Sequence, residues 1–142
     1  MSTNWKTSGI IIFPEDENIK LHTGPTQSGG ASKLWFCNLF NLTPVEMNKL
    51  VENENFNDVA PIFLPHLQGE RAPLWDPNLK GIFYGINSKT NKGNLSRSIY
   101  EGVSFSAKLI PLIPFDDLPL KTLNFFASNL IHLPNLVLRI IS

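Results

Sequence analysis

Length, composition and charge place the chain among globular proteins. It has 142 residues, of which 42% are hydrophobic and 17% charged, and this composition supports a domain with its own core rather than a disordered chain. Twelve basic residues balance twelve acidic ones, so no nucleic-acid partner is expected, because such partners are bound by a basic face. The single cysteine excludes an intramolecular disulfide and fits a cytoplasmic location. No uninterrupted apolar run is long enough to predict a membrane span.

The first elements expected are two extended segments and a helix. The β-branched run at residues 10–13 predicts a short strand, and residues 21–27 are expected to be extended and to enter a loop. A helix is predicted from residue 28 to about residue 40, with Ser28 or Ser32 as its N-terminal cap. The apolar residues that recur at helical spacing are Ala31, Leu34, Trp35 and Leu39.

A second helix is predicted from the run Thr43-Pro44-Val45-Glu46. This run combines a capping box with a proline at the first helical position. The helix should extend to about Glu52. The side chains expected to be buried on it are Val45, Leu50 and Val51.

The following elements are a strand, a long loop, a second strand and a long helix. The strands are expected at residues 59–64 and 82–86, with a loop at 67–80 between them. Thr90 can cap the helix, which should run to about Leu109. One face of it carries Leu95, Ile99, Val103 and Ala107, and its small residues, which allow close approach to a sheet, are Ser96, Ser98, Gly102, Ser104 and Ser106.

The most specific signal is the order of motifs between residues 61 and 108. An apolar strand enters Gly69-Glu70-Arg71-x-Pro73, and then come Trp75-Asp76-Pro77, Gly81-x-Phe83-x-Gly85-Ile86 and Asn94-Leu95-x-x-Ser98-Ile99-Tyr100-Glu101. Together with the upstream glycine loop Gly24–Ser32, this order resembles the C-terminal domain of the FGGY carbohydrate kinases, the xylulokinase and gluconate kinase group.

The resemblance implies a fold and a division of the chain. The fold is α/β, part of an actin-like (ribonuclease-H-like) ATPase domain with a mixed sheet and packed helices, truncated at both ends. Residues 1–18 form an unplaced N-terminal segment, residues 19–108 form the kinase-like part, and residues 109–142 form an apolar tail without family character. The tail has four prolines and no glycine, so it is expected to pack poorly and to favour self-association.

The glycine loop carries the candidate cofactor-binding residues. A strand that ends in glycines and opens a helix directs backbone N–H groups at one place, where the helix dipole attracts an anion. The resemblance implies that Ser28, Gly29, Gly30 and Ala31 face the phosphates of ATP through the backbone. The alternative is that Gly29 and Gly30 only permit a tight turn with positive φ.

A second candidate site is the loop that contains Gly69, Glu70 and Arg71. The adjacent Glu70 and Arg71 side chains point in different directions and can hold separate neighbours. The resemblance places this loop beside a cleft between two domains, as an interdomain loop with a role in domain closure. The alternative is a solvated charge pair. Downstream, Trp75 is expected to be a buried aromatic, and Asp76 is expected to bond the backbone ahead of it.

The remaining polar residues are assigned structural roles. Glu101 should form a structural hydrogen bond, because the family signature also allows glutamine, which cannot act as a base. Asn94 should be a local cap or a polar packing residue, and Cys37 a buried, inert thiol. The three histidines lack the spacing of metal ligands. No catalytic residue and no metal ligand is therefore assigned.

The activity implied by the resemblance is the ATP- and magnesium-dependent transfer of the γ-phosphoryl group to a hydroxyl of a sugar or sugar acid. The base, the magnesium site and the adenine loop of that reaction are not found in this sequence. The chain is therefore interpreted as a kinase fragment that is inactive alone and binds neither ATP nor Mg²⁺ tightly. The alternative is a non-catalytic remnant, or an interaction module that pairs with a separately encoded N-terminal kinase domain.

Overall fold

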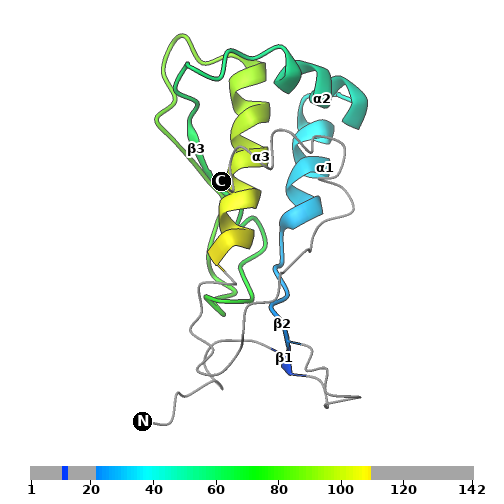
Figure 1. Cartoon of the computed structure of the whole chain (residues 1–142), viewed down its shortest axis with the longest axis vertical. Coiled ribbons are helices and arrows are strands. Elements are labelled where there is room, and N and C mark those ends of the chain that lie inside the picture. The colour runs from blue at the N-terminus through cyan, green and yellow to red at the C-terminus, as the bar shows by residue number, and fades with distance from the viewer. Residues whose placement is uncertain (1–10, 13–21, 110–142) are drawn as a thin grey trace.

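The computed structural model describes residues 11–12 and 22–109 of the chain. The expectations for residues 1–10, 13–21 and 110–142, including the apolar tail, lie outside these described residues. Three helices and four short strands are found within the described part (Figure 1). In chain order they are β1 (Ile11–Ile12), β2 (His22–Thr23), α1 (Gly29–Leu39), α2 (Pro44–Glu52), β3 (Ile62–Leu64), β4 (Ile82–Tyr84) and α3 (Lys92–Leu109).

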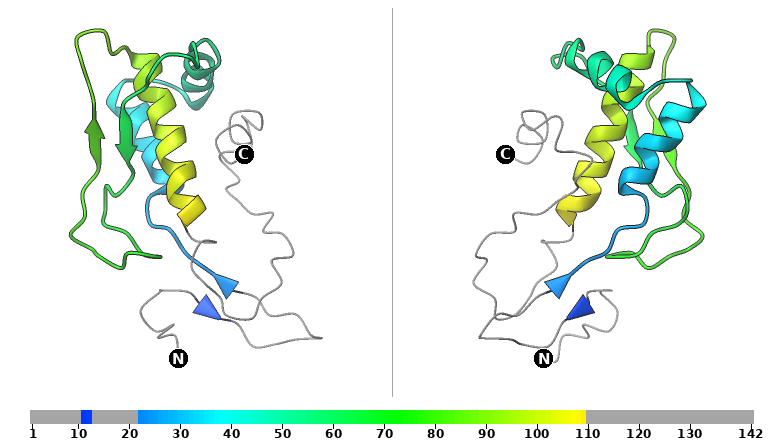
Figure 2. Two further views of the ribbon diagram at one scale, coloured as in Figure 1. Left: turned by 60° about the vertical axis from the view of Figure 1, so that its left-hand side comes forward. Right: turned by 90° about the vertical axis from the view of Figure 1, so that its right-hand side faces the viewer.

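Helix α3 is the element against which the others pack. Helices α1 and α2 and strand β3 all contact it (Figures 1 and 2). The small residues predicted for this helix are all buried. The helix approaches β3 closely at Gly102, where a Cβ atom would lie 2.2 Å from the backbone oxygen of Phe63. The prediction that small residues let the helix lie close to a strand is therefore confirmed.

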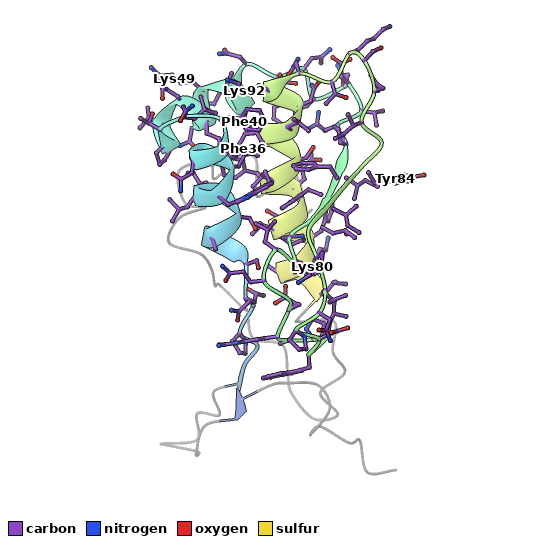
Figure 3. All side chains as sticks on the ribbon, turned by 180° about the vertical axis from the view of Figure 1, so that it is seen from behind. Phe36, Phe40, Lys49, Lys80, Tyr84 and Lys92 are labelled. Carbon is purple, nitrogen blue, oxygen red and sulfur yellow. The ribbon has the colours of Figure 1, made fainter. Side chains whose placement is uncertain are left out.

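The described strands form two antiparallel pairs. Strand β1 pairs with β2, and β3 pairs with β4 in a register that sets Phe63 opposite Phe83. The rings of Phe63 and Phe83 are 4.6 Å apart between centroids, and Phe63 is buried against α3. The side chains on the other face of the β3–β4 ribbon are exposed, and Figure 3 shows Tyr84 projecting away from the helices.

The core lies where α1, α2, α3 and β3 meet. Figure 3 shows Phe36 of α1 and Phe40, the C-cap residue of that helix, on the side that faces α3, and their ring centroids are 4.6 Å apart. The buried residues of this cluster are Phe36, Cys37, Met47, Val51, Phe63, Ile99 and Tyr100. Because these residues come from four separate elements, the core holds the three helices and the β3–β4 ribbon together.

Helix α1 begins and ends close to the predicted residues, but it buries a different face. Leu34 and Leu39 are more than half exposed, while Ser32 and Phe36 are fully buried. The sequence-based interpretation favoured the more apolar face. In the structure the inward face is shared by aromatic, sulfur and small polar side chains, because Ser32 leaves room for the neighbouring helix α3.

The capping box of α2 is confirmed. The Thr43 hydroxyl accepts a hydrogen bond from the Glu46 N–H (3.2 Å), and the Glu46 carboxylate accepts one from the Thr43 N–H (2.7 Å). The bond from the Thr43 N–H, together with a second bond from the Thr43 hydroxyl to the same carboxylate (2.7 Å), lowers the pKa of Glu46. Val51 is buried as predicted, but Val45 is 62% exposed and Met47 is buried instead. Met47 and Val51 are four residues apart and share a face, whereas Val45 lies on the opposite side of the helix.

Two further local predictions are wrong. Helix α3 is capped by Asn91 rather than Thr90: Asn91 and Asn94 exchange side-chain and backbone hydrogen bonds of 2.8 and 3.0 Å, which confirms Asn94 as a local cap. The Thr90 hydroxyl instead accepts from the Asn87 N–H. Trp75 is 51% exposed rather than buried. Its N–H donates to the Arg71 carbonyl across a tight turn, and its φ is 47°, an uncommon value for a residue other than glycine.

The contact at Gly102 should tolerate added volume poorly. We expect Gly102→Ala to lower the free energy of unfolding by about 1–3 kcal/mol, as overpacked cores do, although alanine is the better helix former. Gly29→Ala is the matched control, because its added Cβ meets atoms at ordinary distances of 3.6 and 3.9 Å. Denaturant unfolding of the full chain measures both variants. Equal midpoints for the two would contradict the close contact between α3 and β3.

Candidate functional site

The N-terminus of α1 is the first part of the site. The first hydrogen bond of the helix runs from the Ser32 N–H to the Ser28 carbonyl (3.0 Å). The N–H groups of the preceding first turn, Gly29 to Ala31, therefore have no acceptor within the helix. These donors and the helix dipole together form the kind of geometry that binds an anion. The prediction that the glycine loop opens a helix is confirmed.

The glycines at this helix start are not explained by backbone strain. Among the described residues, the glycines with positive φ are Gly69 and Gly85, whereas Gly29 and Gly30 belong to the first turn of α1. A Cβ atom on Gly29 would meet Thr26 Oγ1 and Val103 Cγ1 at ordinary van der Waals distances. The alternative that these glycines permit a turn with positive φ is therefore wrong.

Ser28 occupies the N-cap position, but neither Ser28 nor Ser32 caps the helix through its side chain. The Ser32 hydroxyl donates to the Ser28 carbonyl (2.6 Å), and Ser28 makes no side-chain cap bond. Ser28 is 1% exposed, and its hydroxyl finds no hydrogen-bond partner among the described residues. A buried hydroxyl without a partner is uncommon. Here it lies at the start of a helix whose first N–H groups also lack partners within the helix.

The second part of the site is the loop from Gly69 to Pro73, which connects β3 to β4. Glu70 is 4% exposed. Its Oε1 accepts hydrogen bonds from the backbone N–H groups of Gln27 (2.7 Å) and Arg71 (2.8 Å), and its Oε2 contacts His66 Nδ1 (3.1 Å). The interpretation that Glu70 locks its neighbours is confirmed, and the alternative of a solvated charge pair is wrong. The Arg71 side chain is exposed.

The two parts of the site are joined by backbone as well. The Ala72 N–H donates to the Pro25 carbonyl (3.1 Å), and the Glu70 N–H donates to the Asp76 carbonyl (2.9 Å). Gly69 has a φ of 79°, and a Cβ there would lie 2.6 Å from the Pro77 Cα, so only glycine fits. Figures 1 and 2 show this loop beside the segment that leads from β2 into α1.

The predicted structural roles of other polar residues are confirmed. Glu101 accepts from Arg97 Nε (2.5 Å), and Arg97 also donates to the carbonyls of Asn55 and Asp58. Asp76 accepts from the Asn78 N–H, as expected. Within residues 11–12 and 22–109, no three His, Cys, Asp or Glu residues lie close enough to hold a metal ion. None of the described helices is long and apolar enough to cross a membrane.

Sequence reasoning missed two polar contacts. His66 meets Glu70 across a loop, where a spacing of four residues carries no helical meaning, so the sequence offers no signal for the pair. Lys33 is buried on α1, donates to Asn48 Oδ1 (3.2 Å) and lies 5.3 Å from the centroid of the Tyr100 ring. The Tyr100 hydroxyl donates to the same Asn48 oxygen. Burial lowers the pKa of Lys33 and raises that of Tyr100.

Comparisons with known proteins agree with this architecture. A model of the C-terminal domain of the FGGY family of carbohydrate kinases matches residues 29–111. The gluconokinase of Bacillus licheniformis is 28% identical over 109 residues, which are 68% of this chain and 21% of that protein. The ligand-bound xylulose kinase of Lactobacillus acidophilus superposes with a TM-score of 0.67 at 29% identity, over 79% of this chain and 24% of that one. The gluconate kinase of the same organism gives 0.61 at 33% identity, over 69% and 20%.

The chain therefore belongs to the FGGY family of carbohydrate kinases, to whose C-terminal domain it corresponds. The predicted fold class is confirmed: an α/β part of an actin-like ATPase domain, as in the xylulose and gluconate kinases. The chain spans about a quarter or less of the length of these relatives.

Cys37 should be unreactive in the folded chain. It is 3% exposed, its thiol contacts Met47 Sδ (3.6 Å), and burial raises its pKa. The thiolate is the reactive form of cysteine, and the raised pKa lowers the thiolate fraction of Cys37. Burial also limits the access of a reagent to the sulfur. We expect a thiol reagent at about pH 8 to label the native chain far more slowly than the chain in denaturant. Equal labelling rates would show that the junction between α1 and α2 opens readily.

Proposed function

We propose that this chain supplies the nucleotide-facing part of an ATP-dependent carbohydrate kinase that transfers the γ-phosphoryl group to a sugar hydroxyl. The observation that carries the proposal is the start of α1, where first-turn N–H groups without helical acceptors lie next to the buried, unpartnered hydroxyl of Ser28. Membership of the FGGY family supplies the reaction class.

In this proposal Ser28, Gly29, Gly30 and Ala31 bind the phosphates of ATP. The first-turn N–H groups donate to phosphate oxygens, and the Ser28 hydroxyl gains the partner that it lacks among the described residues. Glycine at two of these positions leaves the backbone open to close approach. ATP, when bound, supplies the phosphoryl group. The residues of this chain hold and orient it, which lowers the entropic cost of reaction.

The same proposal makes the chain inactive alone. Phosphoryl transfer to a hydroxyl needs a group that accepts the hydroxyl proton and a metal ion that neutralises phosphate charge. In the described part of the chain, Glu70 and Glu101 are both engaged in structural hydrogen bonds. Because the described residues form no metal cluster, no step through Mg²⁺ is assigned to them. In this proposal the base and the metal ligands come from an N-terminal kinase domain, in trans or in the same polypeptide.

The apolar outer face of the β3–β4 ribbon supports such pairing. Its cross-strand neighbours are Ile62 with Tyr84 and Leu64 with Ile82, and all four are exposed. An antiparallel sheet that faces water usually carries polar residues on that side. The sugar or sugar acid would be bound mainly by the N-terminal domain, and the names of the relatives indicate xylulose or gluconate as the substrate class.

The chain alone should not phosphorylate sugars. We expect no turnover in a coupled assay with ATP, Mg²⁺ and a panel of pentuloses, hexoses and sugar acids, because in this proposal the base and the metal ligands come from the N-terminal kinase domain. Heat-treated chain gives the background. Turnover above that background for any sugar would contradict the proposal that the base and the metal ligands come from another domain.

Binding of a nucleotide should be weak and localised. We expect magnesium-ATP at millimolar concentration, about −4 kcal/mol of binding free energy, to shift the amide NMR signals of Gly29, Gly30 and Ala31. Ser28→Ala should weaken this binding by about twofold to tenfold, as expected for one neutral hydrogen bond. Ser104→Ala is the matched control, because Ser104 in α3 is also buried with an unpartnered hydroxyl. Equal effects of both variants, or shifts confined to other residues, would contradict the assignment.

A further inference from the structure

Glu70 is the one acidic side chain that is buried among the described residues. Burial of a carboxylate costs free energy unless hydrogen bonds or a cation compensate for the lost water. Here two backbone N–H groups and one imidazole nitrogen surround it. Hydrogen bonds to a charged group are stronger than those between neutral groups. The buried carboxylate therefore holds its donor groups in fixed positions.

The partners of Glu70 come from two segments that are far apart in sequence. Gln27 lies one residue before the N-cap of α1, whereas Arg71 and His66 belong to the β3–β4 connection. The Gln27 and Arg71 N–H groups donate to the same oxygen, Oε1, at 2.7 and 2.8 Å. A single carboxylate oxygen thus fixes the distance between the start of α1 and the loop.

We propose that Glu70 is a positioning residue that couples the N-terminus of α1 to the loop Gly69–Pro73. A ligand bound at one of these segments then shifts the other. The coupling rests on the proposed function, because the ligand at α1 is the phosphate chain of a nucleotide. Glu70 itself does not touch the ligand. It holds the Gln27 backbone, and Gln27 leads directly into Ser28 and the first-turn N–H groups.

A second hydrogen bond, from the Ala72 N–H to the Pro25 carbonyl, adds to the connection made by Glu70. It runs between the same two segments (3.1 Å), and Ala72 is completely buried. Two bonds between two segments prevent rotation of one against the other, which a single bond would allow. A shift of the α1 start toward a bound phosphate would therefore move the loop with it. The loop is rigid enough to follow, since Gly69 packs against Pro77 without space for a side chain.

Amide hydrogen exchange of the full chain, read residue by residue by NMR, tests the coupling. In the wild type, the Gln27 and Arg71 amides should have similar protection, because they share one acceptor. Glu70→Ala should raise their exchange rates by about tenfold or more, as expected for the loss of a hydrogen bond to a charged group. The amides of Phe63 and Ile99 in the core should change much less.

Two conservative variants separate geometry from charge. Glu70→Gln keeps the Oε1 acceptor in place and should restore most of the protection of Gln27 and Arg71. Glu70→Asp keeps the charge but is one methylene shorter, so it should deprotect Gln27. Glu101→Ala is the matched control: it removes another hydrogen-bonded carboxylate, from the Arg97 pair on α3, and should leave Gln27 and Arg71 unchanged.

Addition of magnesium-ATP to each variant tests the transmission. In the wild type, the shifts at Gly29–Ala31 should be accompanied by shifts at Arg71 and Ala72. The second set should be lost in Glu70→Ala and retained in Glu70→Gln. If magnesium-ATP shifts nothing at α1, the proposed nucleotide site fails, and the exchange experiment still decides whether Glu70 joins the two segments.

Several outcomes would overturn the inference. Unchanged exchange at Gln27 in Glu70→Ala would show that the carboxylate does not hold the α1 start. A uniform rise at all amides would mean that Glu70 only stabilises the fold. If Glu70→Ala does not fold, the wild type and the Gln and Asp variants decide. Unequal protection of the Gln27 and Arg71 amides in the wild type would then overturn the proposal. So would a Gln27 amide that is equally protected in Glu70→Gln and Glu70→Asp.

Discussion

The direct contact between the α3 backbone at Gly102 and the β3 backbone at Phe63 is the constraint on which the described structure depends. It brings the helix against the strand with no side chain between them. Phe63 can then reach the core, and the ring of Phe83 on the paired strand packs against it at a tilt of 36°. The row of small buried residues on α3 keeps this approach possible along the helix. The remaining helices pack around a centre that this contact defines.

Helix α1 is held against that centre by both apolar and polar contacts. Phe36 and Cys37 enter the common core, while the buried Lys33 finds its acceptor on Asn48 of α2. Because Tyr100 of α3 donates to the same Asn48 oxygen, one amide links three helices. A buried amine is tolerated only where such partners and an aromatic face are available. The C-terminal half of α1 is thus fixed by the core, and its N-terminus by the Glu70 loop.

The candidate site consequently consists of backbone presented by a rigid frame rather than of reactive side chains. The first turn of α1 offers N–H donors. The Glu70 carboxylate accepts hydrogen bonds from the surrounding backbone rather than from a substrate. This arrangement suits the binding of a polyanion, which needs several oriented donors and no chemistry from them. The two charged side chains that are buried among the described residues, Lys33 and Glu70, are both held by hydrogen bonds within this frame.

The sequence by itself determined the family, the fold class and the type of nearly every element, because glycines, prolines, capping residues and small helix residues act locally or at fixed spacing. It anticipated the capping box at Thr43 and the close packing at Gly102. The tertiary structure decided which faces are buried: Leu34 and Val45 point outward, and Trp75 lies on the surface, since burial depends on neighbours that hydropathy cannot name. It alone placed Glu70 against Gln27, because a contact across 43 residues leaves no local trace.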